Sequence, residues 1–268
     1  FGKDNKEAYR LLSSARLVTP AKKDGSPRPI GIGMVIRRAG ARSICRKSRQ
    51  ALCARFGPLG QFATGTKAAH EKILWHKRLR LFSPTSHRRR RTSFTADERN
   101  GFNCIERDEI RKQCEKLPAE LLYLRVIFEA YYSQDSDMYL TMDDGTVKTV
   151  LCRGGVHQGD VWGGVFFTIG MSGAWLTLRN EHPSAGLSSY ADDVHGDAAP
   201  GCTTVANSCC PGFKANPAFV QDPDNPGSTT GMYIRADAGD NDVIPEAVFI
   251  LQRWEYLALR YCGLEVRM

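Results

Sequence analysis

The spacing of hydrophobic and polar residues predicts a protein that mixes helices with short strands. Six segments have helix-forming composition or helical spacing of their apolar residues. They are residues 34–56, 67–80, 106–116, 119–132, 161–179 and 246–259. The first two are also basic, residues 161–179 are apolar enough to form a buried helix, and residues 246–259 have an amphipathic pattern.

Extended structure is predicted where β-prone runs meet turn residues. Residues 139–150 form two such runs joined at Asp143-Asp144-Gly145, which is typical of a hairpin. Residues 22–30 indicate a turn that feeds a strand, since each proline there favours extended geometry in the residue before it. Residues 93–97 and 187–196 contain further β-prone runs, whereas residues 200–242 are rich in Pro, Gly, Asp and Asn and indicate loops.

Composition places the 268-residue chain among folded proteins, with 42% hydrophobic and 25% charged residues. The charge is unevenly distributed. Residues 1–96 hold 23 of the 37 Lys and Arg residues and 4 of the 29 Asp and Glu residues, a balance of +19, although the whole chain carries +8. This asymmetry indicates a polyanionic partner for the basic part, and we expect Arg28, Arg37, Arg38 and Arg42 to share a phosphate-facing surface.

Other compositional features set expectations about the compartment. No run reaches the roughly 20 uninterrupted apolar residues of a membrane span, and the first residues are charged where a signal peptide is apolar. Nine cysteines show neither a paired framework nor CxxC spacing, so a reducing compartment is expected. We therefore predict an intracellular protein, nuclear or cytoplasmic, with no secretion signal and no membrane partner.

Two segments carry carboxylates beside β-prone residues. One run ends at Asp97, and the other, Tyr190-Ala191-Asp192-Asp193, has its acids where a hairpin would turn. Two-metal phosphoryl-transfer sites use such clusters because paired divalent cations need several anionic oxygens. Adjacent acids are also common in plain polar turns, as at Asp143-Asp144-Gly145. Asp97 is far from the pair in sequence, so only the fold can bring the candidate ligands together.

A glycine-rich segment directly precedes the apolar helix. Its sequence is Arg153-Gly154-Gly155-Val156-His157-Gln158-Gly159-Asp160. Glycines before a helix let the backbone approach a ligand closely, and the helix N-terminus offers free N–H groups to phosphates or base edges.

Taken in order, these segments resemble the reverse transcriptases of non-LTR retrotransposons. The stretch from Asp97 to Asn103, with Asn100-Gly101-Phe102-Asn103, is similar to the first palm motif of that family. Gly155 to Gly159 is similar to the second, and Tyr190 to Asp193 to the third. Arg28-Pro29-Ile30, behind Lys22-Lys23-Asp24-Gly25, resembles the fingers element. The resemblance covers about residues 17–200. It departs from the family at His157, where proline or glutamine is common, and after Asp160, where the family has a proline.

The resemblance implies an α+β fold with a right-hand polymerase palm, an antiparallel sheet backed by helices. Residues 1–96 would be the basic, mainly helical fingers region, and residues 97–200 the palm with the catalytic motifs. Residues from about 117 to 150 are open to packing with the fingers. Residues 201–268 would hold the loop-rich end of the palm and a C-terminal helix. No thumb is recognisable, which is consistent with a fragment or a degenerate copy.

The activity that the resemblance implies is RNA-directed DNA synthesis by two-metal nucleotidyl transfer. The partners would be an RNA template, a DNA primer and deoxynucleoside triphosphates, and the cofactor two Mg²⁺ ions, with Mn²⁺ as a substitute. The implied catalytic and metal-binding residues are Asp97, Asp192 and Asp193. The implied nucleotide-binding residues are Lys22, Arg28, Phe102, Gln158 and Gly159, with Phe102 as a steric gate against ribonucleotides. The implied template and primer contacts are Arg28, Gly155 and Tyr190.

Two alternatives stay open at this point. One is an RNA-directed RNA polymerase of the same palm fold, although such enzymes usually have a second Asp where Phe102 stands and Gly-Asp-Asp in the hairpin. The other is a non-catalytic nucleic-acid-binding remnant, which the unusual second motif and the missing thumb favour. The three aspartates argue against it.

Overall fold

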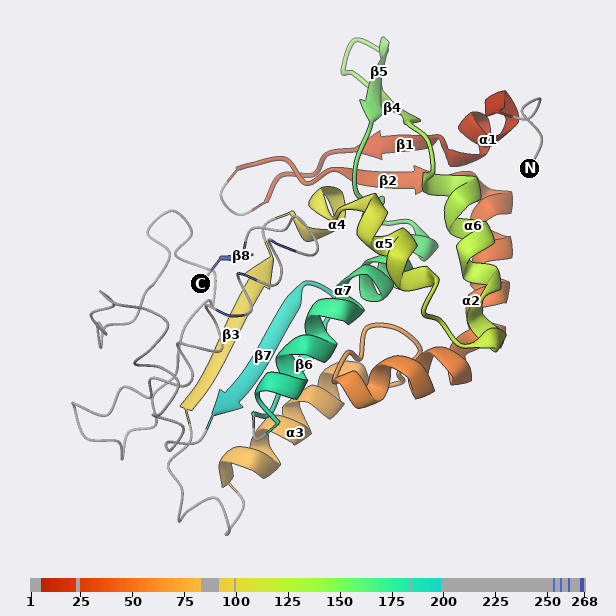
Figure 1. The fold of residues 1–268 in the computed structure, drawn as a ribbon. Helices are drawn as coiled ribbons and strands as arrows, with labels where there is room; N and C mark the ends of the chain where they lie inside the picture. Colours follow the sequence, from red (N-terminus) through yellow and green to blue (C-terminus); the bar gives the residue numbers. More distant parts are fainter. Residues whose placement is uncertain are drawn as a thin grey trace.

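The computed structural model describes residues 6–22, 25–82, 92–98, 100–183, 185–198, 253, 256, 260 and 266–267. In this part of the chain, two four-stranded sheets are connected and covered by helices (Figure 1). The expected loops of residues 200–242 lie outside the described residues, as does most of the expected helix of residues 246–259.

The first sheet joins the amino-terminal region to the middle of the chain. Its strand order is β2-β1-β4-β5, and the strands are β1 (Ala15–Val18), β2 (Ile30–Gly33), β4 (Ser136–Thr141) and β5 (Val147–Cys152). Strands β1 and β4 run parallel, whereas the other neighbours are antiparallel. The sheet is therefore mixed, and it brings a segment near residue 140 beside the amino-terminal hairpin.

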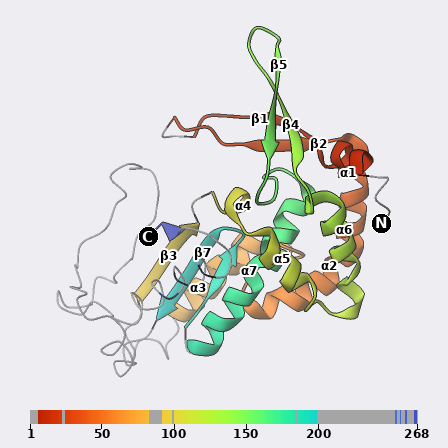
Figure 2. The same ribbon diagram turned by 45° about the horizontal axis from the view of Figure 1, so that its top comes forward.

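The turn residues predicted the second hairpin of this sheet, and in the first they predicted a turn that feeds a strand. Gly25 N–H donates to the carbonyl of Lys22 over 3.0 Å in the first turn, and Gly145 adopts a φ of 79° in the second. The second hairpin stands away from the rest of the sheet (Figure 2), and β5 is exposed along nearly its whole length. The predicted strand pairing of residues 139–150 is confirmed.

The second sheet is antiparallel throughout and has the order β6-β7-β3-β8. Its strands are β3 (Thr92–Glu98), β6 (Ser188–Tyr190), β7 (Asp193–Ala198) and β8 (Val266–Arg267). One face of the β6–β7 hairpin packs through Val194 into the main core, and the other face packs through Tyr190 against Ala69 and Ile73. Both faces of this hairpin are therefore covered, which fixes the orientation of its two strands.

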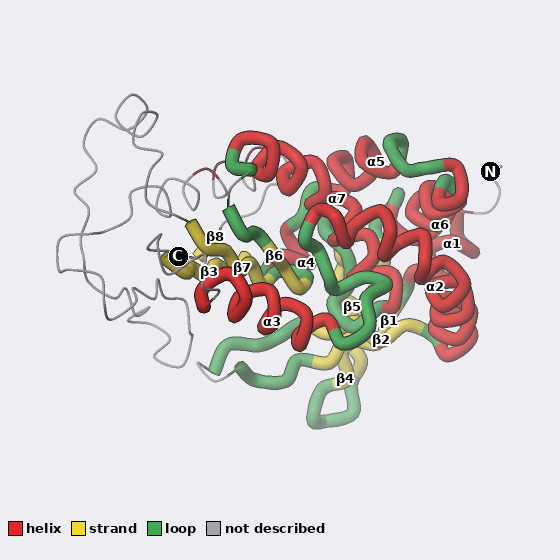
Figure 3. The backbone as a smooth tube through the Cα atoms, turned by 90° about the horizontal axis from the view of Figure 1, so that it is seen from below, coloured by secondary structure: helices red, strands yellow, loops and turns green. Residues whose placement is uncertain are grey.

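Helices form most of the main core, which packs against the second sheet, whereas the first sheet has a small apolar cluster of its own. The helices are α1 (Lys6–Ser13), α2 (Val35–Phe56), α3 (Ala69–Phe82), α4 (Gly101–Cys104), α5 (Arg107–Cys114), α6 (Tyr123–Tyr132) and α7 (Val161–Glu181), with short 3₁₀ turns η2 (Gly57–Leu59) and η3 (Ala119–Leu121). Figure 3 shows α3 along one side of the β6–β7 hairpin and α7 along the other. The predicted helix of residues 119–132 is divided, because Pro118 leads into the 3₁₀ turn before α6 begins.

Helix α7 is the centre of the core. Trp162, Phe166, Phe167 and Trp175 on this helix are at most 2% exposed. By length and composition α7 is also the one helix of the described residues that could cross a membrane, with a mean hydropathy of 1.3. However, 72% of its apolar window is buried inside the fold, so packing accounts for its composition.

Candidate active site

The second sheet brings together the two acidic segments that lie far apart in sequence. Asp97 on β3 pairs directly with Asp193, the first residue of β7. Residues directly opposite each other in an antiparallel pair have Cα atoms about 4.5–5.5 Å apart. Asp192 occupies the turn immediately before β7. The backbone register thus places all three aspartates at one end of the sheet, although the side chain of Asp97 lies outside the described set.

The turn that carries Asp192 has an unusual backbone. Ala191 has a φ of 54°, the left-handed region that costs a residue with a Cβ about 1–2 kcal/mol. Its neighbour Tyr190 is half-buried, and its ring lies 4.1 Å from the imidazole of His70 on α3. A non-glycine residue keeps such a conformation where the surrounding structure holds it in place.

Gln61 anchors this turn through two hydrogen bonds. Its side chain is 1% exposed, and the carboxamide bonds both backbone groups of Ala191. Oε1 accepts from the Ala191 N–H over 3.2 Å, and Nε2 donates to the Ala191 carbonyl over 3.3 Å. Sequence reasoning missed Gln61, because a single glutamine after a 3₁₀ turn carries no motif. The one local signal is the preceding Gly60, whose φ of 82° lets the chain pass against the carbonyl of Leu187.

The electrostatic environment of the turn favours a cation. Asp193 reaches solvent, yet the atoms packed around its carboxylate raise its pKa above the ordinary value, an effect that nearby His70 opposes. Burial lowers the pKa of His195 on the same strand to about 4, so this imidazole is neutral near pH 7. A positive ligand beside Asp193 would offset the cost of partly desolvating its negative charge.

The donor set fits a hard divalent cation. Asp97, Asp192 and Asp193 supply carboxylate oxygens, the ligands that Mg²⁺ and Mn²⁺ prefer. Among the side chains that the structure describes, there is no cluster of three or more His, Cys, Asp or Glu residues with the geometry of a metal site. That set excludes the side chain of Asp97, so the metal-binding role of the three acids stays a prediction.

The glycine-rich segment lies against the first acidic motif. Val156 N–H donates to the carbonyl of Phe102 over 2.6 Å. Gly155 has a φ of 61°, and a Cβ there would lie 2.3 Å from the carbonyl oxygen of Asn103. Only glycine fits this close approach, so the loop packs on α4 through its backbone at Gly155. Gly155 therefore has no side chain with which to contact a template or primer.

The same loop also lies against the β1–β2 hairpin. Gly31 N–H on β2 donates to the carbonyl of Gln158 over 2.8 Å. Gly159 has a φ of 93°, and a Cβ there would lie 2.7 Å from Cγ2 of Ile30. The loop therefore connects Arg28-Pro29-Ile30 with Phe102, which are two of the segments singled out from the sequence.

Phe102 packs at the edge of the core. Asn100, with a φ of 52°, turns the chain from β3 into α4 and so directs Phe102 inward. The ring stacks on Phe167 of α7 with centroids 4.7 Å apart, and Phe102 remains half-buried. One part of this side chain thus has a packing role, while its exposed part is available to a ligand.

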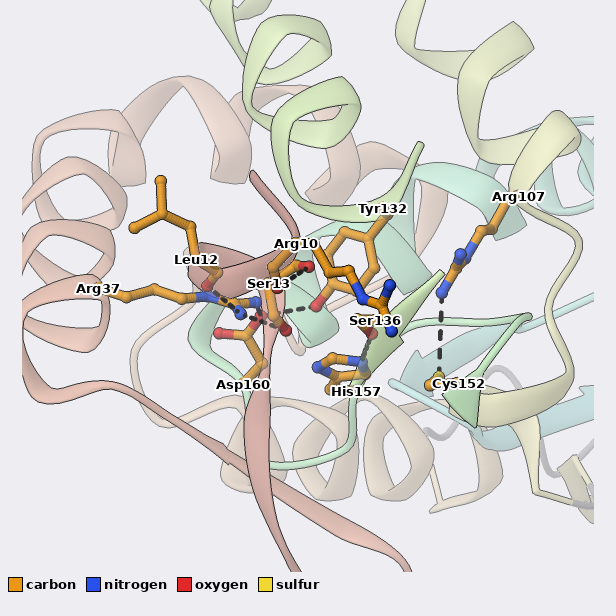
Figure 4. A network of polar contacts seen from close by, with 10 residues as sticks. All are labelled: Arg10, Leu12, Ser13, Arg37, Arg107, Tyr132, Ser136, Cys152, His157 and Asp160. Carbon is orange, nitrogen blue, oxygen red and sulfur yellow. Dashed lines mark hydrogen bonds and ion pairs between the residues drawn. The ribbon is translucent and has the colours of Figure 1, made fainter. Parts of the chain in front are cut away.

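A buried polar network supports the loop at its other end (Figure 4). Asp160, directly before α7, is paired with Arg37 of α2, and both side chains are 1% exposed. Tyr132 donates to the same Asp160 oxygen over 2.6 Å. Arg37 also donates to the carbonyls of Leu12 and Ser13 over 3.0 Å each. The expectation that Arg37 faces a phosphate is wrong, because the fold uses this cation internally.

His157 has a structural place in the same network. Its Nε2 is 3.0 Å from the hydroxyl of Ser136 on β4, and its ring meets Tyr132 edge-on at 5.5 Å. Burial lowers the pKa of His157 to about 4, and the nearby Arg37 adds to this effect. A neutral histidine thus fills the position where the resembling family commonly has proline or glutamine.

Lys22 and Arg28 lie in the segment that connects β1 with β2. Arg28 is exposed just before β2, and Lys22 is half-buried in the hairpin turn. The hairpin of β1 and β2 extends above α4 and the end of β3 in Figures 1 and 2. Arg38 and Arg42 share one side of α2, with Arg42 exposed and Arg38 half-buried.

No protein-family model matches the chain, and no curated protein sequence matches it. Solved structures do match. Apo telomerase from Candida tropicalis, truncated from its C-terminal domain, aligns with a TM-score of 0.50 at 12% identity, covering 70% of this chain and 44% of the other. Telomerase from Candida albicans, in complex with a fragment of telomeric RNA, aligns with a TM-score of 0.50 at 14% identity, covering 72% and 39%.

The fold is reverse-transcriptase-like. At these identities the comparison supports the fold alone, and the chain spans about two fifths of the length of the telomerase chains. Within this fold, the structure brings Asp97 to Asp193, Gly155 to Phe102, and Gly159 to the β1–β2 hairpin.

Proposed function

We propose that the chain is the core of an RNA-directed DNA polymerase. The observation that carries this proposal is the register of the second sheet, which pairs Asp97 with Asp193 and places Asp192 in the adjoining turn. The reverse-transcriptase-like fold supports it. The proposal includes a relation to the reverse transcriptases of non-LTR retrotransposons, and this part is supported by the sequence motifs alone.

In this proposal Asp97 and Asp192 hold two Mg²⁺ ions, and Asp193 supports them. Bound Mg²⁺ would stabilise the negative charge that develops on the reacting phosphate. The protein contributes position and charge: β3 and β7 fix the acids relative to each other, and the tied turn limits their movement. Three carboxylates close together are also mutually repulsive, which favours cation binding.

The nucleotide would lie between the acids and the glycine-rich loop. Phe102 would meet the sugar, while Gln158 and Gly159 would support the base from the loop that rests on β2. Lys22 and Arg28 would contact the triphosphate and the template from the hairpin, with Gly155 and Tyr190 near the template and primer. Arginine suits phosphate oxygens because its planar fork donates two parallel hydrogen bonds.

The proposed partners are an RNA template, a DNA primer and deoxynucleoside triphosphates. The RNA partner is supported by the basic composition of residues 1–96 and by the telomerase from Candida albicans, which was solved with RNA. A primer-extension assay tests the function: an RNA template, a DNA primer and Mg²⁺ or Mn²⁺ should give extension with dNTPs. Extension with NTPs alone would indicate an RNA polymerase, and nucleic-acid binding without any extension would indicate a remnant.

Affinity for nucleic acid is expected to fall steeply with salt. A stripe of cations on α2 is formed by Arg38, Arg42 and Arg46, spaced four residues apart. Replacing all three with glutamine should weaken binding and reduce the slope of log affinity against log salt by about 0.7–0.9 for each phosphate that the variant no longer neutralises. Fluorescence anisotropy with a labelled RNA–DNA duplex at several salt concentrations measures both effects.

The matched control removes the same number of positive charges from other helices. Lys112, Lys116 and Arg125 are exposed cations on or beside α5 and α6. Their triple glutamine variant should keep the wild-type slope. Equal slopes for the two triple variants would contradict a role of the α2 stripe.

Phe102→Val is expected to admit ribonucleotides. Removing a ring that clashes with a 2′-hydroxyl relieves a steric exclusion, so the ratio of rNTP to dNTP incorporation should rise by more than the roughly 10–200-fold that one methylene provides. The variant also loses the stack on Phe167, so its melting temperature should fall. Single-nucleotide incorporation and thermal unfolding are measured on the same preparation.

Phe128→Leu serves as the control for reduced packing. Phe128 is fully buried in the same core on α6, away from the acids. This variant should lower the melting temperature and leave sugar preference unchanged. If Phe102→Val behaves in the same way, Phe102 is a packing residue and the gate assignment is wrong.

A further inference from the structure

Gln61 joins two parts of the chain that are 130 residues apart at the candidate catalytic turn. The segment around it runs beside β6: Phe62 N–H donates to the carbonyl of Ser189 over 2.9 Å, and Ser189 N–H donates to the carbonyl of Gly60 over 2.8 Å. These bonds fix the backbone of Gln61 beneath the turn. From there its side chain extends to Ala191.

The chemistry of the contact requires a carboxamide. Ala191 offers one donor and one acceptor, and the glutamine side chain presents one of each in a single plane. Oε1 also accepts from the N–H of Ala63 over 3.0 Å, which holds the carboxamide in its orientation. A glutamate would lack the donor, and an apolar side chain would lack both groups while leaving the buried Ala191 N–H and carbonyl unpaired.

Ala191 is the residue whose backbone needs this support. It has a positive φ, is 8% exposed, and stands between Tyr190 and Asp192. Its conformation sets the direction in which the chain leaves β6 and therefore where Asp192 and Asp193 begin. Groups that orient metal ligands without touching the metal commonly change metal affinity or activity by about 10–100-fold when they are replaced.

We propose that Gln61 is the positioning residue of the catalytic turn: through both backbone groups of Ala191 it fixes Asp192 and Asp193 for divalent cations. This inference rests on the proposed function for its catalytic purpose. The contact itself belongs to the fold and can be measured whether or not the chain is an enzyme.

The test compares wild type with Gln61→Met, which keeps an unbranched side chain of similar length and loses both hydrogen bonds. Hydrogen exchange at Ala191, followed by mass spectrometry of a peptide spanning residues 187–196, should become about two- to tenfold faster, the range for loss of one net hydrogen bond. Binding of Mn²⁺ alone should weaken about 10–100-fold. In primer extension, kcat should fall with little change in the KM for primer–template. If Gln61→Met does not fold, Gln61→Asn replaces it, because the shorter carboxamide cannot reach both groups of Ala191.

Gln113→Met is the matched control. Gln113 is a second buried glutamine, 5% exposed, which bonds Glu109 and Ser172 on α5 and α7. Its replacement should lower the melting temperature and leave exchange at Ala191, Mn²⁺ binding and kcat at wild-type values. If the Gln61 variant matches the Gln113 variant in all three measurements, Gln61 is an ordinary core residue and the inference is overturned.

The two proposals fail in different ways. Wild-type protein that neither binds Mn²⁺ nor extends a primer would contradict the proposed function, and with it the catalytic purpose of Gln61. The exchange measurement would still decide whether Gln61 stabilises the turn at Ala191. Active wild-type protein whose Mn²⁺ affinity is insensitive to Gln61 would contradict this inference alone.

Discussion

Replacing Arg37 by methionine is expected to lower the free energy of unfolding by about 3–5 kcal/mol, the usual result of removing one partner of a buried ion pair. The change leaves the Asp160 carboxylate buried with Tyr132 as its remaining hydrogen-bond donor among the described residues. It also removes the donors to Leu12 and Ser13, which tie α1 to α2. Urea unfolding measures the decrease.

Arg10→Gln is the control for this prediction. Arg10 pairs with Asp137 over 2.8 Å, but the arginine side chain is 55% exposed, and exposed pairs contribute little to stability because water screens them. The double variant Arg37→Met with Asp160→Leu should recover much of the stability, because neither charge is then left unpaired. An Arg37→Met protein no less stable than Arg10→Gln would show that the buried pair does not support the fold.

Replacing Asp97 or Asp192 by asparagine is expected to reduce primer extension to background. Either change removes an anionic oxygen that a divalent cation needs, while the amide keeps the size and shape of the side chain. Affinity for a primer–template duplex should change little, because it depends on the basic amino-terminal region. Extension is measured in Mg²⁺ and in Mn²⁺, and affinity by fluorescence anisotropy.

The chain offers a second pair of adjacent acids as a control. Asp143 and Asp144 form the exposed turn between β4 and β5, and Asp144 bonds Thr146. Asp143→Asn should retain wild-type extension. Full activity of Asp97→Asn and Asp192→Asn, or an equal loss in Asp143→Asn, would contradict the assignment of the catalytic acids.

The sequence predicted most local structure, because local structure depends on nearby residues. Helix-forming and apolar composition located α2, α3, α5 and α7, and Asp143-Asp144-Gly145 located the β4–β5 turn through the positive φ that glycine adopts easily. Order and spacing of the motifs also indicated the reverse-transcriptase-like fold that the telomerase comparison supports. The domain boundaries and the roles of the site residues stay predictions.

The tertiary structure decided which residues meet and which charges are buried. Arg37 has the sequence environment of a surface cation on a basic helix, and the pairing with Asp160 across 123 residues makes it internal. Gln61 carries no motif, and its importance arises from lying under a turn 130 residues away. By itself the sequence determined the types of element and the candidate acids, since these follow from spacing and side-chain chemistry. Burial, ion pairing and the register of Asp97 with Asp193 depend on contacts between distant segments, which spacing along the chain does not encode.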